Sequence, residues 1–187
     1  MRFMPRGRGY TLKKLFPVVA LLCGRPVLQA DNSLEEHARR GNVALQENDF
    51  ATAETEYRAF VAISPQVAEI RSNLGIALYM QSKFEQAEKQ FRAAVRINPR
   101  LFIPNYFLGK RLFQINRYSE ARNFLEIAST IKPDDVETRH WLAATYVGLK
   151  EEEKGISEFR KILKQEPHNV DALYGIGKTY TELADQS

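Results

Sequence analysis

The sequence predicts an all-α fold, a right-handed α-solenoid of helix–turn–helix repeats, and three observations point to it. Four prolines are spaced 34 residues apart, at Pro65, Pro99, Pro133 and Pro167. Small and large apolar residues recur at fixed distances before each proline. Between these positions, apolar side chains follow the 3,4 spacing of one helical face. A 34-residue period of this kind indicates pairs of helices that bury their apolar faces by stacking on their neighbours.

Three columns of residues keep the same register as the prolines. Small residues lie twelve positions before them, at Ala53, Ala87, Ala121 and Gly155. A second small column lies twelve positions earlier still, at Gly41, Gly75, Gly109 and Ala143. Aromatic or large apolar residues lie eight positions before the prolines, at Tyr57, Phe91, Leu125 and Phe159. The agreement of these columns at one period excludes a chance match.

The second copy shows how each repeat divides into two helices. A first apolar face consists of Ile70, Leu74, Ala77 and Leu78, and a second consists of Phe84, Ala87, Phe91, Ala94 and Val95. Pro99 ends the second helix, because proline cannot donate to the amide ladder and disfavours helical geometry in its predecessor. We expect helices of roughly 14 and 13 residues joined by a tight turn. Gly75 and Ala87 should meet where the two axes approach most closely, and in copy four Ala143 and Gly155 exchange these sizes.

These motifs resemble the tetratricopeptide repeat family, whose pattern is W-x2-L-G-x2-Y, then A-x3-F, then P. In copy two the match is carried by Leu74, Gly75, Leu78, Ala87, Phe91 and Pro99, and in copy three by Leu108, Gly109, Leu112, Ala121, Ala128 and Pro133. Copy four keeps Leu142, Tyr146, Phe159 and Pro167. The opening tryptophan column is missing, since Trp141 lies two places later, and copy one has His37 and Arg40 where apolar residues are usual.

The resemblance gives the domain boundaries. Repeats are expected at residues 34–67, 68–101, 102–135 and 136–169, followed by a partial or capping helix at 170–183. Together they form a tetratricopeptide repeat domain over residues 31–187. In the last helix Tyr174, Gly177 and Tyr180 are in register, yet no second helix follows. The small residue at Gly177 therefore predicts self-association through this helix, or a longer protein, with a finished cap as the alternative.

Residues 1–30 have the order of a secretory signal peptide. The segment holds six basic residues and no acidic one. Five of the basic residues precede a nine-residue apolar run, which is followed by a short exit to Val27-Leu28-Gln29-Ala30. The run is shorter than the roughly 20 residues that span a bilayer. We expect cleavage near Ala30 and export to the periplasm or the medium. A buried N-terminal helix is one alternative, and lipid attachment at Cys23 is a weaker one, because Leu22 stands where a lipobox has a small residue.

The sequence excludes several classes of function. The net charge of +4 comes from the first segment, since residues 31–187 hold 21 basic and 23 acidic residues, so no nucleic-acid partner is expected. His37, His140 and His168 are scattered and have no metal-ligand spacing. No phosphate-binding loop and no nucleophile–base pair is readable. We therefore expect no catalytic residue, no metal and no cofactor, and a chain that is not an enzyme.

The concave groove lined by first helices is the candidate site. Family geometry predicts that it is lined by Asn42, Ile76, Tyr79, Met80, Ile103, Tyr106, Lys110, Phe113 and His140. Exposed aromatic residues and methionine would suit a partner helix or an extended peptide. The alternative is that half of these side chains pack between neighbouring first helices.

One groove type of the family can be tested by residue. Carboxylate-clamp members bind chaperone C-termini through two asparagines and three cationic residues. Asn42 and Asn73 match the asparagines, whereas Ala38, Ile103 and Phe107 occupy the cationic positions. A terminal carboxylate would have no counter-ion there, so this interpretation fails.

The sequence thus predicts an exported, non-catalytic protein-interaction module that binds a peptide or helix of unknown identity. The alternative is a structural or assembly subunit of an envelope or pilus-type complex. A scaffold fragment of a larger enzyme is a third, weaker hypothesis.

Overall fold

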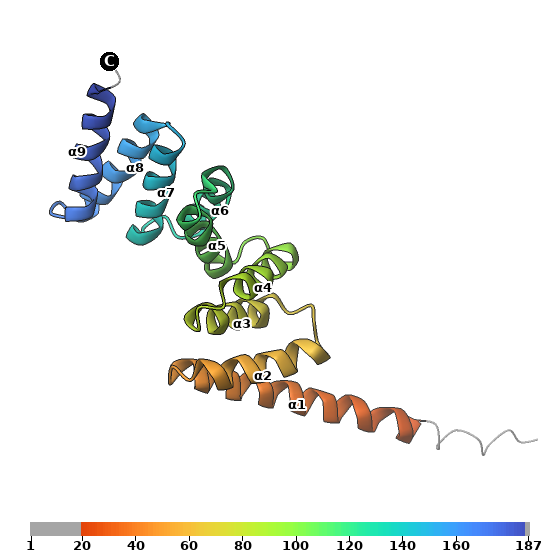
Figure 1. Ribbon diagram of the computed structural model, residues 1–187. Helices are drawn as coiled ribbons and strands as arrows, with labels where there is room; N and C mark the ends of the chain where they lie inside the picture. Colours follow the sequence, from red (N-terminus) through yellow and green to blue (C-terminus); the bar gives the residue numbers. More distant parts are fainter. Residues whose placement is uncertain (1–19, 186–187) are drawn as a thin grey trace, which may run out of the picture.

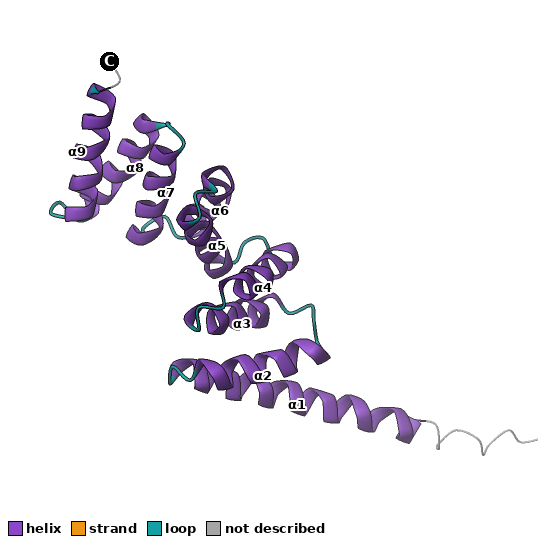
Figure 2. Cartoon of the chain, viewed as in Figure 1, coloured by secondary structure: helices purple, strands orange, loops and turns teal. Residues whose placement is uncertain are grey.

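The computed structural model describes residues 20–185, with side chains from residue 33 onward. Over this range the chain forms nine helices and no strand (Figure 2), as an all-α fold requires. The helices are α1 Ala20–Gln46, α2 Phe50–Ile63, α3 Ala68–Met80, α4 Phe84–Ile97, α5 Phe102–Gln114, α6 Tyr118–Ile131, α7 Val136–Gly148, α8 Glu152–Gln165 and α9 Val170–Ala184. Each expected repeat contributes two of them, so the helical-repeat solenoid is confirmed.

The helices pack in chain order and form an elongated stack (Figure 1). Within each repeat the two helices pair, α1 with α2, α3 with α4, α5 with α6 and α7 with α8. Each second helix then packs on the first helix of the next repeat, and α9 packs on α8. The core follows the solenoid as two clusters, a large one from α1 to α7 and a small one where α7, α8 and α9 meet. Repeats stack in this way because no single pair of helices could bury both its faces.

A residue with a left-handed backbone lies in the turn inside every repeat. Asn48, Ser82 and Asn116 have φ of 60° and Lys150 has φ of 62°, and these positions are again 34 residues apart. In each turn the next residue donates its amide to a carbonyl near the end of the first helix, as Lys83 N does to Leu78 O at 3.0 Å. Asparagine tolerates this geometry better than most residues do, and it occupies two of the four positions.

The residue before each proline of the 34-residue column ends a second helix with non-helical backbone geometry. Ser64, Asn98, Lys132 and Glu166 have φ between −126° and −133° and donate their amides back into the helix. The clash between the proline ring and its predecessor causes this geometry. The predicted ends of the second helices are thus confirmed.

The glycine column lies beneath the large apolar column. A Cβ placed on Gly75 would lie 2.5 Å from the Phe91 ring, and one on Gly41 would lie 2.6 Å from the Tyr57 ring. The atoms nearest to that Gly75 position belong to Phe91 and not to Ala87, the residue that we paired with it from the sequence. Gly41 and Gly75 are therefore needed because an aromatic ring of the second helix rests on each, and Gly109 because the Leu125 side chain rests on it.

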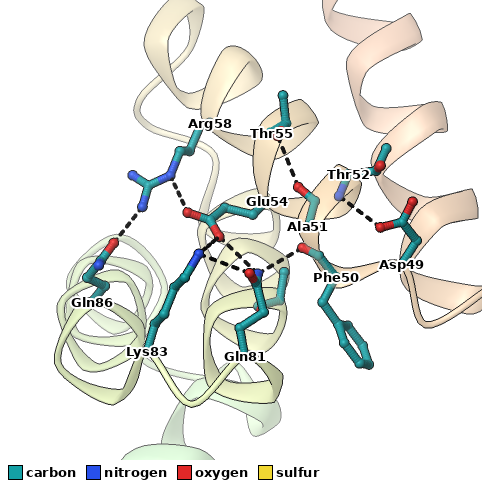
Figure 3. A network of polar contacts seen from close by, with 11 residues as sticks. Asp49, Phe50, Ala51, Thr52, Glu54, Thr55, Arg58, Gln81, Lys83 and Gln86 are labelled. Atoms are coloured by element: carbon teal, nitrogen blue, oxygen red, sulfur yellow. Dashed lines mark hydrogen bonds and ion pairs between the residues drawn. The ribbon is translucent and has the colours of Figure 1, made fainter.

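Ion pairs connect neighbouring repeats along one edge of the stack. Glu54 of α2 accepts hydrogen bonds from Arg58 at 2.8 Å, from Lys83 at 2.7 Å and from Gln81 at 2.9 Å (Figure 3). Burial raises the pKa of Glu54, but these donors outweigh burial and keep its pKa below the ordinary value. Since Lys83 lies in the turn of the next repeat, this network fixes the register between the first two repeats.

The N-terminal expectation falls largely outside the described residues. α1 begins at Ala20 and continues without a break through Ala30, the expected cleavage position, into the first repeat. Nothing in the described residues supports a signal peptide, which stays a prediction. No helix in residues 20–185 is both long and apolar enough to cross a bilayer.

Candidate functional site

A pocket of about 560 Å³ lies among α5, α7 and α9, and we call it the α7–α9 pocket. Its floor consists mainly of aromatic and small side chains: Phe113, Tyr118, His140, Ala144, Val147 and Phe159. α9 closes it with Tyr174, Gly175 and Thr179. Charged side chains stand at its rim, among them Lys150, Asp171, Lys178 and Glu182. An apolar floor with a polar rim is typical of sites that hold one large side chain of a ligand.

The pocket exists because α9 has a glycine where α5 and α7 have large aromatic residues. Phe107, Trp141 and Gly175 occupy the same position in successive copies. Phe107 stacks on Phe91, with ring centroids 5.4 Å apart, and Trp141 contacts Phe113 at 5.3 Å. Gly175 offers no side chain, and the Phe159 ring of α8 rests directly against it. The space that an aromatic side chain fills in copies three and four is therefore open at the last helix.

The aromatic walls hold each other in place. The ring centroids of Phe113 and Tyr118 lie 5.4 Å apart, and the His140 ring meets the Phe159 ring edge-on with centroids 5.8 Å apart. His140 also contacts Trp141 edge-on at 5.7 Å. Such packed rings present a rigid surface, so a bound apolar side chain would lose little free energy to reordering of the pocket.

A polar cluster lies beside the pocket, in the middle of the groove. Tyr106 donates its hydroxyl hydrogen to Glu137, and Lys110 Nζ lies 3.0 Å from the Glu137 carboxylate and 3.1 Å from the Tyr106 hydroxyl. The ammonium group also lies 5.3 Å from the Trp141 ring centroid. Burial, followed by the Glu137 carboxylate, raises the pKa of Tyr106. Lys110 is thus already paired within the groove and is no free cation for an anionic ligand.

The other predicted groove residues divide into packed and exposed ones. Tyr106 is buried, whereas Ile76, Tyr79, Ile103, Lys110, Phe113 and His140 are half-buried. Tyr79 contacts Phe84 and Phe107 with ring centroids 5.2 and 4.8 Å apart. Asn42 and Met80 are exposed. Of the nine predicted residues, Phe113 and His140 line the pocket.

The two asparagines of the clamp pattern bond within the protein. Asn42 Oδ1 accepts a hydrogen bond from the Tyr57 hydroxyl at 2.7 Å, and Asn73 Nδ2 lies 3.4 Å from the same oxygen. They contact one another across α1 and α3. Both side-chain amides are therefore engaged within the protein.

Sequence reasoning missed the α9 side of the pocket. Gly175, Tyr174 and Lys178 line it, whereas the repeat register marks Gly177, which does not. The signal that could have found them is the column Phe107, Trp141 and Gly175, in which two large side chains are followed by none.

No group of three or more histidine, cysteine, aspartate or glutamate residues in the described part of the chain could hold a metal ion. The His37 ring faces Glu56, with Nδ1 and Oε2 2.6 Å apart. His140 packs between aromatic rings.

Comparison with known proteins agrees with this architecture. Residues 39–101 match the tetratricopeptide repeat family. The structure of YrrB, described as a TPR protein with an unusual peptide-binding site, matches with a TM-score of 0.77 and 19% identity over 84% of this chain and 85% of that one. MamA (residues 41 to the end) from Desulfovibrio magneticus RS-1 matches with a TM-score of 0.74 and 21% identity, over 82% and 86% of the two chains. Pseudomonas aeruginosa PilF matches with a TM-score of 0.66 and 19% identity, over 84% and 72%.

No curated protein matches the sequence significantly. At these identities the structural matches establish the fold alone.

Proposed function

Because tetratricopeptide repeats match residues 39–101 and the described chain is a helical-repeat solenoid throughout, we propose that it is a non-catalytic protein-interaction module. It binds an extended peptide or a helix of a partner protein along the concave groove. The α7–α9 pocket takes one large apolar side chain of that partner. The observation that carries the proposal is the open space above Gly175, in a position that Phe107 and Trp141 fill in copies three and four.

The chemistry of the pocket limits the ligand. Its floor of Phe113, His140 and Phe159 favours an aromatic or long aliphatic side chain. At its rim Lys178 Nζ lies 3.7 Å from Glu182 Oε1, so charges of both signs surround the opening. A ligand of mixed polarity therefore fits better than a uniformly acidic or basic one.

A photo-crosslinking experiment identifies the partner and tests the site. A photoreactive amino acid replaces Tyr174 at the pocket rim, and in a matched control it replaces Lys89, an exposed residue of α4. We expect a specific protein adduct from position 174 in native cells and none from position 89. Crosslinks from position 89 alone would contradict binding in the groove.

A second experiment fills the pocket. Ala144 lies on its floor and is half-buried, so Ala144→Phe should occupy the space that the ligand needs. We expect the purified partner to bind this variant about tenfold more weakly or worse, a loss of roughly 1.4 kcal/mol. Ser157→Phe on the exposed side of α8 is the control and should bind as the unchanged chain does.

We also propose that the protein acts outside the cytoplasm. The proposal rests on the basic, apolar and small-residue order of residues 1–30. N-terminal sequencing of the native protein tests it, and we expect the chain to begin near Asp31. Intact Met1 on protein from the cytosol would exclude export.

A further inference from the structure

A second cavity lies beside the α7–α9 pocket, near the N-terminal ends of α7 and α9. It has a volume of about 410 Å³, and we call it the N-terminal subsite. Its lining residues are Val136, Glu137, His140, Trp141, Asn169 and Asp171. His140 and Asp171 line the α7–α9 pocket as well, so the two cavities adjoin. One extended peptide can therefore place neighbouring side chains in both.

Glu137 has one carboxylate oxygen that the protein does not use. Tyr106, Lys110 and Trp141 all donate to Oε1, Lys110 from 3.0 Å and Trp141 from 3.4 Å. Oε2 has no donor in the part of the chain that the structure describes, and the side chain is 61% exposed. Because three donors hold Oε1, the carboxylate is oriented before a ligand arrives, and Oε2 is a preorganised acceptor.

Asp171 supplies a second carboxylate from α9. Its side chain is exposed and has no hydrogen bond or ion pair with any described residue. Asn169, in contrast, is used within the protein, since Oδ1 accepts from the Ala172 amide at 2.9 Å and Nδ2 donates to Glu166 at 2.7 Å. The carboxylates available to a ligand thus come from two helices, Glu137 from α7 and Asp171 from α9.

The charges at the subsite favour a cation. Its lining residues include two carboxylates and neither lysine nor arginine, so an anionic ligand would be repelled. Lys110 pairs with Glu137 and balances one of the carboxylates, which leaves one negative charge for a ligand to balance. A neutral apolar side chain would desolvate the carboxylates without giving them a partner.

The shape of the subsite favours arginine among the cations. A guanidinium group has donors along the edges of a plane, so it can bridge carboxylates of two helices. Its flat face can also lie on an aromatic ring, which Trp141 provides in the subsite. A lysine ammonium group is a compact charge that is more strongly hydrated, so lysine should bind there more weakly.

We infer that the N-terminal subsite binds an arginine side chain of the partner peptide whose large apolar side chain enters the α7–α9 pocket. This inference rests on the proposed function and adds the second side chain that the groove selects. In an extended peptide, side chains two residues apart point to the same side and lie about 7 Å from each other. The arginine is therefore expected two positions before or after the apolar residue.

Helix ends give the two carboxylates another use. Glu137 and Asp171 lie in the first turns of α7 and α9, where negative charge is favourable because it faces the partial positive charge of the helix end. That effect stabilises the helices whatever the ligand carries. Only a readout that depends on the guanidinium group of the ligand distinguishes the two roles.

Selection from a random decapeptide library displayed on phage, with the full chain immobilised, gives the first test. We expect the enriched peptides to carry an aromatic or long aliphatic residue with an arginine two positions away. Selection on Asp171→Asn should keep the apolar residue and reduce the enrichment of arginine. Enrichment of the apolar residue without arginine on the unchanged chain would overturn this inference and leave the proposed function standing. A selection that enriches no peptide would overturn both.

Binding of one selected peptide then measures the contact with the guanidinium group. In a second version of the peptide citrulline replaces the arginine, because citrulline keeps the shape of the side chain and lacks its charge. We expect fluorescence anisotropy to show about tenfold weaker binding of the citrulline version to the unchanged chain. Asp171→Asn should weaken binding of the arginine peptide about threefold, as for an exposed ion pair, and leave binding of the citrulline peptide unchanged.

Glu69→Gln is the matched control. Glu69 is exposed and occupies in copy two the position that Glu137 occupies in copy four. This variant should bind both peptides as the unchanged chain does. Equal losses of the arginine and citrulline peptides on Asp171→Asn would show that Asp171 acts on its helix alone, and they would overturn the inference. In light scattering, a dimer that the peptide dissociates would place a second copy in the subsite and would overturn its assignment to a separate partner.

Discussion

The ring of Phe159 in α8 rests on Gly175 of the next helix, α9. In copies one to three the residue of the Phe159 column rests on a glycine sixteen positions earlier, in its own repeat. In copy four Ala143 has replaced that glycine, and Gly155 has replaced the alanine that pairs with it. A Cβ on Gly155 would lie 2.6 Å from Val147, so α8 lies close to α7 at this point. The changed contacts of copy four thus coincide with the glycine that opens the pocket.

We predict that two glycines of α9, two residues apart, respond in opposite ways to alanine. Gly175→Ala places a methyl group against the Phe159 ring and should lower the free energy of unfolding by about 1–3 kcal/mol. Gly177→Ala meets nothing within 4 Å and should raise it by about 0.5–1 kcal/mol through helix propensity. Urea unfolding of the full chain measures both changes. If Gly177→Ala lowered the free energy of unfolding instead, this position of α9 would already be in contact with other residues.

The glycine beneath Phe91 gives a second prediction. Gly75→Leu should destabilise the fold by about 1–3 kcal/mol or more, because even a Cβ would lie 2.5 Å from the ring. Glu69→Gln, at an exposed position of the same helix, should change stability by less than about 0.5 kcal/mol. Thermal unfolding distinguishes them. Equal melting temperatures would mean that α3 and α4 can separate without cost at this point.

The 34-residue period was enough to predict the helices and their ends. Pro99 and its equivalents mark where second helices stop, because one residue type acts by the same steric mechanism each time. The left-handed column was missed for the opposite reason. Asn48, Ser82, Asn116 and Lys150 share a conformation but not a residue type, so no sequence column reveals it.

The pocket could not be predicted from the period. It depends on the missing side chain at Gly175 and on the position of the Phe159 ring. That position follows from the way α8 packs on α9, which the repeat period does not specify. The sequence names candidate groove residues in the middle of the solenoid, but it does not show which of their polar groups already have partners within the protein. Tyr106 is buried, and its hydroxyl and Lys110 are both satisfied by Glu137, a residue of the next repeat.

The inter-repeat network at Glu54 gives a third prediction. Its side chain is 13% exposed, and its carboxylate receives hydrogen bonds from Arg58, Lys83 and Gln81 (Figure 3). Glu54→Gln should lower the free energy of unfolding by about 1 kcal/mol, a value reduced by solvent around the lysine. Glu85→Gln, at an exposed position of α4, is the control and should change it by less than about 0.5 kcal/mol. A cost at Glu85 as large as that at Glu54 would argue against the network.

The groove cluster gives a prediction on pH. Burial raises the pKa of Glu137, but hydrogen bonds from Tyr106 and Lys110 outweigh burial, and its pKa lies below the ordinary value of 4.5. A carboxyl group whose pKa is lowered by folding stabilises the fold above its unfolded pKa, and this contribution is lost as the pH falls through the folded pKa. The stabilisation from Glu137 should therefore be complete at neutral pH and should disappear in acid.

The measurement compares the unchanged chain with Glu137→Gln in urea. At about pH 7 the variant should be less stable, because glutamine keeps the shape of the side chain but loses the charge that faces Lys110. As the pH falls below the ordinary pKa of 4.5, the two stabilities should converge, since Glu137 then takes up a proton. Glu69→Gln is the control, and its difference from the unchanged chain should stay near zero throughout. If the Glu137→Gln difference were the same in acid and at neutral pH, the charge of Glu137 would not stabilise the groove, and the position of Tyr106 would depend on packing alone.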